Sequence, residues 1–296
     1  MKPASGGASM TNMTNGEPNR ACRGYKRSLE IPQAVVSGRT SSLAFLGFSA
    51  LLFAVCTTVT IAWCASMSAV GGMPMPGGWT MSMAWMRMPG KTWPEMMASF
   101  LTMWDVMMMA MMLPSLIAML WHYRHAAVRS GIIRLNWLSV LVAAGYFFVW
   151  TVVGIVIFPL GTALATMAMR QPALARAVPV TIGAVVLIAG SFQFTGWKMH
   201  HLTCCREMPD VSVLPAGPFT AWRYGVRLGF HCCRCCANLM IILFVIGIMD
   251  LRVMAVITAA ITIERLAPAS ERVVWAIGFI AVGAGLFLIT SSLGIG

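Results

Sequence analysis

The chain is rich in the sulfur-containing side chains that bind soft metals. Its 296 residues include 26 methionines and nine cysteines. Thioethers and thiolates are soft ligands that suit Cu(I), and thiolates also suit zinc. These side chains are concentrated in a methionine-rich stretch over residues 71–112 and a cysteine- and histidine-rich stretch over residues 198–236. Both stretches are therefore candidate sites for a soft metal.

The first candidate site is the loop at residues 71–95. Glycines and prolines keep the start of this loop irregular, and its Met-x-Met spacing suits the capture of Cu(I) in an oxidising compartment. Contact of its tryptophans with the membrane surface is the alternative, because Trp favours the interface. The candidate ligands are Met73, Met75, Met81, Met83, Met86 and Met88.

The second candidate site lies within the apolar run that follows. Helical spacing places Met107 and Met111 on one stripe, with Met112 beside it. Asp105 occurs in the same run, where a carboxylate is costly unless it faces a partner or a wet cavity. We expect these four side chains to form an intramembrane site. Methionine that fills gaps in a membrane core is the alternative.

The third candidate site combines the segments 198–206 and 229–236. The second segment contains Cys-x-x-Cys twice, and about 25–30 residues separate the two segments, so one helical hairpin could bring them together. Thiolate and imidazole close the ligand shells of Cu(I) and zinc. A redox relay by dithiol exchange is the alternative. The predicted ligands are His201, Cys205, Cys232, Cys235 and Cys236.

The elements that must position these residues are membrane helices. The chain is 58% hydrophobic and only 10% charged, whereas soluble domains carry about 25% charged residues. This composition excludes cytosolic globular, disordered and collagen-like chains, and predicts an all-α, polytopic helical membrane bundle. The expected spans are 41–69, 96–120, 136–160, 179–197, 234–250 and 273–293. The short run 253–263 is a half-helix, an interfacial helix or a continuation past Asp250, which leaves a seventh span open.

Charge gives the expected orientation. Residues 1–40 read as a disordered cytoplasmic tail, and residues 41–296 as the helical membrane domain. Fourteen lysines and arginines then fall on the cytoplasmic side and seven on the other, which favours a cytoplasmic N-terminus in a bacterial inner membrane. The loop 71–95 is then on the outer face, and the cysteines lie at the inner end of a span. The net charge of +12 therefore reflects membrane insertion, and nucleic acid is not an expected partner.

Three motifs resemble a bacterial family of predicted metal-binding integral membrane proteins. The run Trp104–Ser115 resembles its Trp…Met…Ala-Met-Met-x-Pro-Ser signature. Gln193, Lys198, His201 and Cys205-Arg206 are similar to its Gln…Lys-x-x-Cys-Leu-x-x-Cys-Arg pattern. The third motif covers Gly229–Met240, Gly247–Leu251 and Glu264-Arg265, and the match extends over about residues 70–266.

The sequence departs from the family pattern at four positions. His201 stands where the family has Cys, Arg234 and Ala237 replace Gly and Trp, and Asp250 replaces Asn. The resemblance implies a copper-handling role, with members that help load copper into oxidases of the tyrosinase type.

We therefore expect an integral membrane protein that binds Cu(I), with zinc as the alternative metal. Its expected role is to deliver copper to a partner metalloenzyme, such as a copper-dependent oxidase. A copper transporter, a membrane dithiol oxidoreductase and a structural subunit of a larger complex are the alternatives. The sequence has no Gly-x-Ser-x-Gly, His-Glu-x-x-His or P-loop motif, so we do not expect an enzyme.

Overall fold

The computed structural model describes residues 37–82, 85, 90, 92–129, 135–206, 217–267 and 270–294. Most of the predicted tail therefore lies outside the described residues, as do Met83, Met86 and Met88. The helices and strands are α1 (Ser37–Val70), β1 (Met73–Met75), β2 (Trp79–Met81), α2 (Trp93–Arg129), α3 (Leu135–Arg170), α4 (Pro172–Ser191), η2 (Phe192–Phe194), α5 (Gly196–Arg206), α6 (Pro218–Ile246), α7 (Leu251–Leu266) and α8 (Ser270–Ser292).

The described chain is a helical membrane bundle, as the composition predicts. Six helices are long and apolar enough to cross a bilayer, namely α1, α2, α3, α4, α6 and α8. Helix α7 has 16 residues and is therefore about 24 Å long, shorter than a hydrocarbon core of about 30 Å. The run 253–263 is thus a separate short helix, and it does not add a seventh span.

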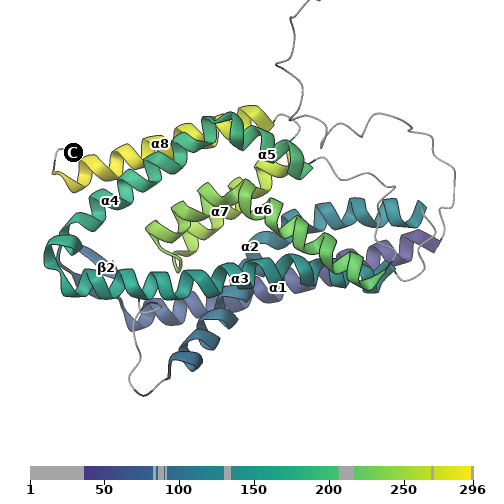
Figure 1. Ribbon diagram of the computed structural model, residues 1–296, viewed down its shortest axis with the longest axis horizontal. Helices are drawn as coiled ribbons and strands as arrows, with labels where there is room; N and C mark the ends of the chain where they lie inside the picture. The colour runs from purple at the N-terminus through teal and green to yellow at the C-terminus, as the bar shows by residue number, and fades with distance from the viewer. Residues whose placement is uncertain are drawn as a thin grey trace, which may run out of the picture.

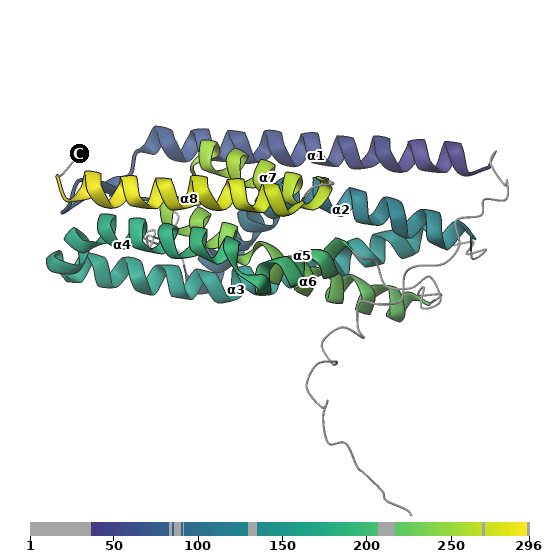
Figure 2. The same ribbon diagram turned by 90° about the horizontal axis from the view of Figure 1, so that it is seen from above.

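The helices lie roughly along one common direction (Figures 1 and 2). Helix α1 packs on α2, and α2 packs on α3. Helices α4 and α8 form a close pair on the opposite side of the bundle in Figure 1. Helix α6 packs along α3, and the short α7 contacts α2, α6 and α8. Helices α6 and α7 therefore lie between the α4–α8 pair and the helices α1 to α3 (Figure 1).

Small residues allow α6 and α3 to approach closely. Ala221, Gly225 and Gly229 repeat every fourth residue on the buried face of α6. A side chain at Gly225 would clash with the Val142 carbonyl, and one at Gly229 would lie 2.9 Å from the Tyr146 carbonyl. Such spacing of small residues is how membrane helices bring their backbones together. It fixes the rotation of α6 and so the direction of the cysteines that follow.

The predicted span 234–250 is wrong at its N-terminal end. Helix α6 begins at Pro218, so Cys232 and Cys236 lie in its middle rather than at the membrane end of a span. The polar residues Arg223, Arg227 and Arg234 lower the local hydropathy and made this segment resemble a loop. In the helix all three are exposed on the face opposite the glycines, so they do not interrupt the buried face.

A capped turn separates α6 from α7. Helix α6 ends at Ile246, and Gly247 has a φ of +154°. The Asp250 carboxylate accepts hydrogen bonds from the backbone N–H groups of Arg252 and Val253, at 2.8 and 3.2 Å. Aspartate at this position satisfies backbone donors at the first turn of a helix. Asp250 therefore caps a new helix, so the run 253–263 is not a continuation of α6 past Asp250.

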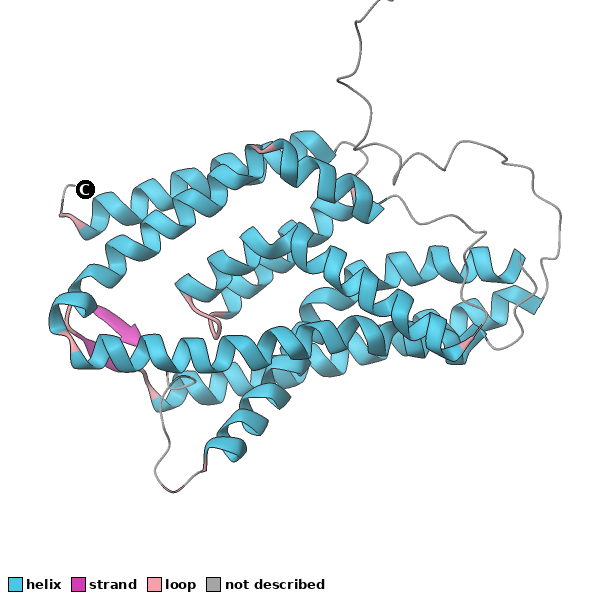
Figure 3. Cartoon of the chain, viewed as in Figure 1, coloured by secondary structure: helices cyan, strands magenta, loops and turns pink. Residues whose placement is uncertain are grey.

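The methionine-rich loop begins with a small β-hairpin (Figure 3). Strands β1 and β2 are antiparallel, with Met73 opposite Met81 and Met75 opposite Trp79. The Trp79 indole donates a hydrogen bond to the Ala175 carbonyl at 2.9 Å, which ties the hairpin to α4. The start of this loop is thus regular, contrary to the expectation from its glycines and prolines.

Candidate metal site

Two cysteines of α6 form a deeply buried pair. Cys232 and Cys236 are one helical turn apart, and they are 0% and 1% exposed. Both belong to the same buried cluster, and residues four apart lie on the same face of a helix. We call Cys232 and Cys236 the thiol pair. Because two sulfur ligands meet in a dry part of the bundle, the pair has the donor atoms and the setting for a soft metal.

A polar side chain of α3 contacts the thiol pair. The Tyr146 hydroxyl lies 2.8 Å from Cys232 Sγ, a position that the close approach of α3 and α6 makes possible. Arg265 of α7 is also buried, and its Nη1 lies 3.9 Å from Met119 Sδ of α2. The Tyr146 contact therefore orients Cys232 from α3.

Cys235 is buried but belongs to different surroundings. Its side chain packs with Leu202 and Val274, in a cluster separate from that of Cys232 and Cys236. Its backbone carbonyl accepts a hydrogen bond from Lys198 Nζ at 2.7 Å. The structure thus separates the predicted cysteine ligands of α6 into the thiol pair and Cys235, which lies beside a polar network.

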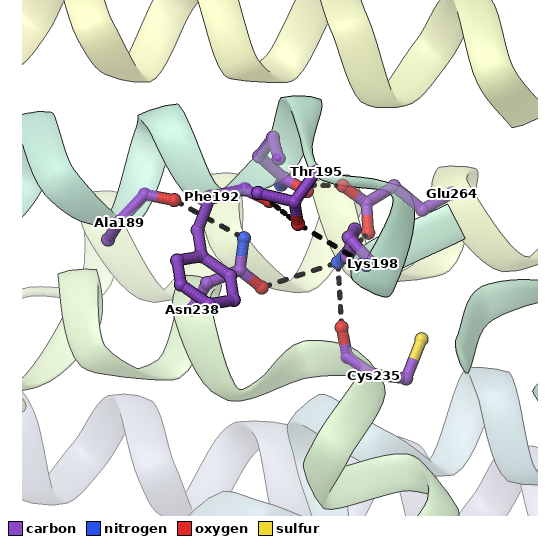
Figure 4. Close-up of polar contacts among 8 residues, drawn as sticks. Ala189, Phe192, Thr195, Lys198, Cys235, Asn238 and Glu264 are labelled. Carbon is purple, nitrogen blue, oxygen red and sulfur yellow. Dashed lines mark hydrogen bonds and ion pairs between the residues drawn. The ribbon is translucent and has the colours of Figure 1, made fainter. Parts of the chain in front are cut away.

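That network is centred on a buried ion pair (Figure 4). Lys198 Nζ lies 2.9 Å from Glu264 Oε2, with side-chain exposures of 1% and 2%. Lys198 Nζ also donates to Asn238 Oδ1 at 3.3 Å. Buried charges are stable only when they are paired and hydrogen-bonded. We call these side chains, together with Gln193, the lysine network.

The remaining polar groups extend the lysine network to other elements. Gln193 Nε2 of η2 donates to Glu264 Oε1 at 2.8 Å. Asn238 Nδ2 donates to the Ala189 carbonyl of α4 at 3.4 Å. The network therefore joins α4, η2, α5, α6 and α7, and it fixes the end of α7 that carries Arg265.

Sequence reasoning did not select the lysine network as a site. Gln193, Lys198 and Glu264 appear in the motifs that resemble the membrane family, but only as pattern positions. Their common signal is the presence of polar side chains in or beside apolar helices, where each needs a partner. Asn238 carries the same signal inside α6. A search for polar side chains in or beside apolar helices would therefore have selected all four residues of the lysine network together.

The predicted intramembrane methionines lie in the same core as the thiol pair. Met107, Met111 and Met112 of α2 are all buried in the cluster that contains Cys232 and Cys236. They lie between Trp104, whose ring stacks on Phe244 of α6, and Met119, which packs against the cluster of Cys235. The buried methionines are therefore on the segment of α2 between its contact with Phe244 and its contact with the cluster of Cys235.

Asp105 has a partner in the next helix. The Thr151 hydroxyl of α3 donates a hydrogen bond to Asp105 Oδ1 at 3.0 Å. The adjacent Trp104 indole donates to the Trp150 carbonyl at 2.8 Å. These two hydrogen bonds hold α2 against α3 next to the methionines. Asp105 therefore has a structural partner as well as its predicted metal role.

The methionines of the hairpin differ from one another in environment. Met81 is only 3% exposed and packs with Ala165 and Ala168 of α3, whereas Met73 is 41% exposed. Met75 is partly buried against the same cluster. The side chain of Met81 therefore fills the contact between the hairpin and α3, whereas Met73 is the more accessible of the predicted ligands.

His201 lies on α5, apart from the membrane spans. Its ring is 4.2 Å from that of Trp197 and 5.6 Å from that of His200. Burial lowers the pKa of His201, and the positive charges of His200, Arg234 and His231 lower it further. The imidazole therefore resists protonation, which keeps its nitrogen lone pair available to a metal. The side chain of Cys205, its predicted co-ligand, lies outside the described residues.

Within the described ranges, no group of three or more histidine, cysteine, aspartate and glutamate side chains could hold a metal ion. The thiol pair thus supplies two ligands, and methionines are buried in the same cluster. Two thiolates suit Cu(I), whereas a structural zinc site takes four ligands in a tetrahedron. The chemistry of the site therefore fits copper better than zinc.

Comparison with known proteins identifies a family. The sequence profile of the PpoB2 family, described as copper chaperone, matches residues 101–288. This range includes α3 to α7, and with them the thiol pair and the lysine network. No curated protein and no solved structure matches the chain.

Proposed function

The chain belongs to the PpoB2 copper chaperone family, and on that premise we propose that it holds Cu(I) at the thiol pair. In this proposal Cys232 and Cys236 bind the ion as thiolates, within the membrane domain. The observation that carries the proposal is the juxtaposition of two fully buried thiols in a methionine-lined core. Burial excludes water and oxidants, which protects bound Cu(I).

The hairpin methionines are proposed to capture the ion at one end of the bundle. Met81 contacts Ala165 of α3, while the thiol pair contacts Tyr146 of the same helix. These two positions are 19 residues apart, or about 28 Å along the helix axis. The ion cannot pass directly between sites that far apart. The buried methionines of α2 and Asp105 are therefore proposed as an intermediate binding site.

The recipient is proposed to be a copper-dependent oxidase or another metalloenzyme at the membrane. Delivery from the thiol pair requires an exit towards α5, where His201 and Cys205 are proposed to pass the ion on. With a cytoplasmic N-terminus in a bacterial inner membrane, the hairpin faces outwards. The lipids of that membrane cover the apolar outer faces of the six spans.

Copper content after purification tests the proposal. The full chain is purified in mild detergent under reducing conditions with copper and zinc both present, and metals are measured by elemental analysis. We expect about one or more copper ions per chain in the wild type, and loss of copper in the Cys232→Ser/Cys236→Ser variant. Cys56→Ser is the matched control, because Cys56 is a buried cysteine of α1 away from this site.

Two results would reject copper binding at the thiol pair. One is wild-type protein without copper, and the other is equal copper in the double variant and in the Cys56→Ser control. A variant with Met107→Leu, Met111→Leu and Met112→Leu tests the intermediate binding site in the same way. Its copper content should fall if these thioethers are ligands, and should stay unchanged if they only fill the core.

A copper transporter is the second candidate function. The half-buried Asp105, hydrogen-bonded to Thr151 inside two neighbouring spans, favours it, because polar groups within spans mark ion pathways. Copper flux into sealed vesicles separates the two functions. Flux that depends on Asp105 supports transport, whereas copper binding without flux supports delivery to a partner.

A further inference from the structure

Two further sulfur atoms meet in the bundle, apart from the thiol pair. The Cys64 thiol of α1 donates to the Met249 thioether in the turn between α6 and α7, with 4.0 Å between the two sulfurs. Cys64 is 2% exposed, and Met249 is partly buried against the same core. Cys64 lies outside the residues that match the copper chaperone family. We call Cys64 and Met249 the second sulfur pair.

The second sulfur pair lies towards the hairpin end of the bundle. Cys64 is six residues, or about 9 Å, before the end of α1 at Val70, and the hairpin begins at Met73. The thiol pair contacts α3 at Tyr146, which is 24 residues, or about 36 Å, before the end of α3 near the hairpin. The two sulfur pairs are therefore at different depths.

The turn that carries Met249 lies within the length of the bundle rather than at its end (Figure 3). Gly225 of α6 lies against Val142 of α3. Gly229 lies against Tyr146, one turn further along both helices, so α6 and α3 run in parallel. Helix α6 ends 21 residues after Gly225, whereas α3 continues for 28 residues after Val142, or about 10 Å further. Helices that break at such a depth are where membrane transporters bind their ions.

The spacing of the two sulfur atoms suits one metal ion between them. With metal–sulfur bonds of about 2.3 Å, sulfurs 4.0 Å apart subtend an angle of about 120° at a shared ion. This is the angle between neighbouring ligands in a planar three-coordinate shell. Thiolate and thioether are both soft donors, and they select Cu(I). The second sulfur pair therefore needs little rearrangement to hold a soft ion.

From these contacts we infer that Cys64 and Met249 form a second intramembrane site, which binds a monovalent soft cation such as Cu(I) or Ag(I). On binding, the S–H bond of Cys64 breaks, its proton passes to water, and a metal–sulfur bond forms at the thiolate. One positive charge leaves as another arrives, so the site stays neutral in apolar surroundings, where uncompensated charge is costly. This site is additional to the thiol pair and does not depend on it.

The surrounding contacts hold both sulfur atoms in place. Helix α1 packs along α2, and Cys64 faces the core from α1. In the turn, the backbone N–H of Asp250 donates to the Gly247 carbonyl at 3.2 Å, and the Asp250 carboxylate caps α7. Ile248, the residue before Met249, is 1% exposed. The turn therefore fixes Met249 from both sides.

The affinity for Cu(I) in a chain without the thiol pair tests the inference. The full-length Cys232→Ser/Cys236→Ser chain keeps the second sulfur pair, so the copper lost in that variant is that of the thiol pair alone. This background chain is loaded with Cu(I) and titrated with a bathocuproine chelator. Cys64→Ser and Met249→Leu are then added to it separately. Circular dichroism and size-exclusion profiles establish that each variant is folded.

Two variants in the same background serve as controls. Cys56→Ser removes another buried thiol of α1, and Met167→Leu removes an exposed thioether of α3. We expect the affinity for Cu(I) to fall by more than about 10-fold in Cys64→Ser and in Met249→Leu, because even groups outside the ligand shell contribute about 10–100-fold. Neither control should change the affinity.

Equal affinities in Cys64→Ser and Cys56→Ser would overturn the inference, and would mean that the two sulfurs only pack against each other. The same holds for equal affinities in Met249→Leu and Met167→Leu. The thiol pair is absent from all of these chains, so such a failure leaves the proposed function standing. Conversely, a wild type that loses no copper in Cys232→Ser/Cys236→Ser would reject the proposed function and leave this inference standing.

A measurement on the wild type keeps the inference falsifiable if Cys64→Ser or Met249→Leu does not fold. Peroxide oxidises thioethers to sulfoxides, and a bound cation occupies the sulfur lone pair that reacts. Ag(I), added in excess over the thiol pair, should slow the oxidation of Met249 and leave that of Met167 unchanged, as measured by mass spectrometry of peptides. An unchanged rate at Met249, or equal slowing at both residues, would overturn the inference.

Discussion

The buried ion pair of the lysine network should make the fold sensitive to the loss of either charge alone, and substitution of Lys198 gives a quantitative test. Lys198→Met leaves the Glu264 carboxylate 2% exposed without its cation. Removal of one partner of a buried pair typically costs about 3–5 kcal/mol. The Cys235 carbonyl and Asn238 Oδ1 also lose a donor. We therefore expect the free energy of unfolding to fall by about 3–5 kcal/mol in Lys198→Met.

The double variant separates the ion pair from the packing around it. Lys198→Met/Glu264→Met removes both charges, so no isolated charge remains in the core. Its loss of unfolding free energy should be smaller than the sum of the losses in Lys198→Met and Glu264→Met. The difference, which is the interaction free energy of the two charges, should be about 2–3 kcal/mol. Arg223→Met is the control, because Arg223 is exposed on α6 and such surface changes stay within about 0.5 kcal/mol.

Reversible unfolding by dodecyl sulfate in mixed micelles, followed by circular dichroism, provides the free energies. Two results would refute the reasoning. One is a loss below about 1 kcal/mol in Lys198→Met, which would mean that water or lipid head groups solvate Glu264. The other is strict additivity of the two single losses, which would mean that the two charges do not interact in the folded protein.

Three further predictions use the same unfolding assay. Gly225→Ala should lower the free energy of unfolding by about 1–3 kcal/mol, because the new methyl group clashes with the Val142 carbonyl. Gly283→Ala is the control, because its added methyl group meets nothing within 4 Å. An equal loss in the two variants would contradict this prediction. Asp250→Ala should lose about 1 kcal/mol of helix capping, while Asp250→Asn should keep most of it; equal losses would refute the cap. Because the pKa of His201 is lowered in the folded state, stability should fall as the pH drops below the unfolded value of about 6.5, and His201→Gln should remove that part of the pH dependence.

The membrane architecture could be predicted from the sequence, because apolar runs of bilayer length have few alternatives to a membrane-spanning helix. It placed the start of α6 about 16 residues too late. Hydropathy averages over all faces of a helix, so the exposed stripe of Arg223, Arg227 and Arg234 hid the buried stripe of small residues. The stripe Ala221, Gly225 and Gly229 was the better indicator, because it marks close helix contact.

The candidate site was predictable in part. Four cysteines within five residues pointed to metal chemistry, but adjacent positions on a helix face different directions. This geometry places Cys235 in separate surroundings from Cys232 and Cys236. The contact of Tyr146 with Cys232 joins residues 86 positions apart, which no local pattern specifies. The burial of Met81 likewise depends on the distant residues Ala165 and Ala168.

The central claim is that Cys232 and Cys236 bind Cu(I) inside the membrane domain. X-ray absorption at the copper edge tests it most directly, on the purified full chain loaded with one equivalent of Cu(I). The account predicts a Cu(I) edge with a first shell of sulfur, which changes in Cys232→Ser/Cys236→Ser and is unaltered in Cys56→Ser. A first shell of nitrogen and oxygen, or an identical sulfur shell in the double variant, would contradict it.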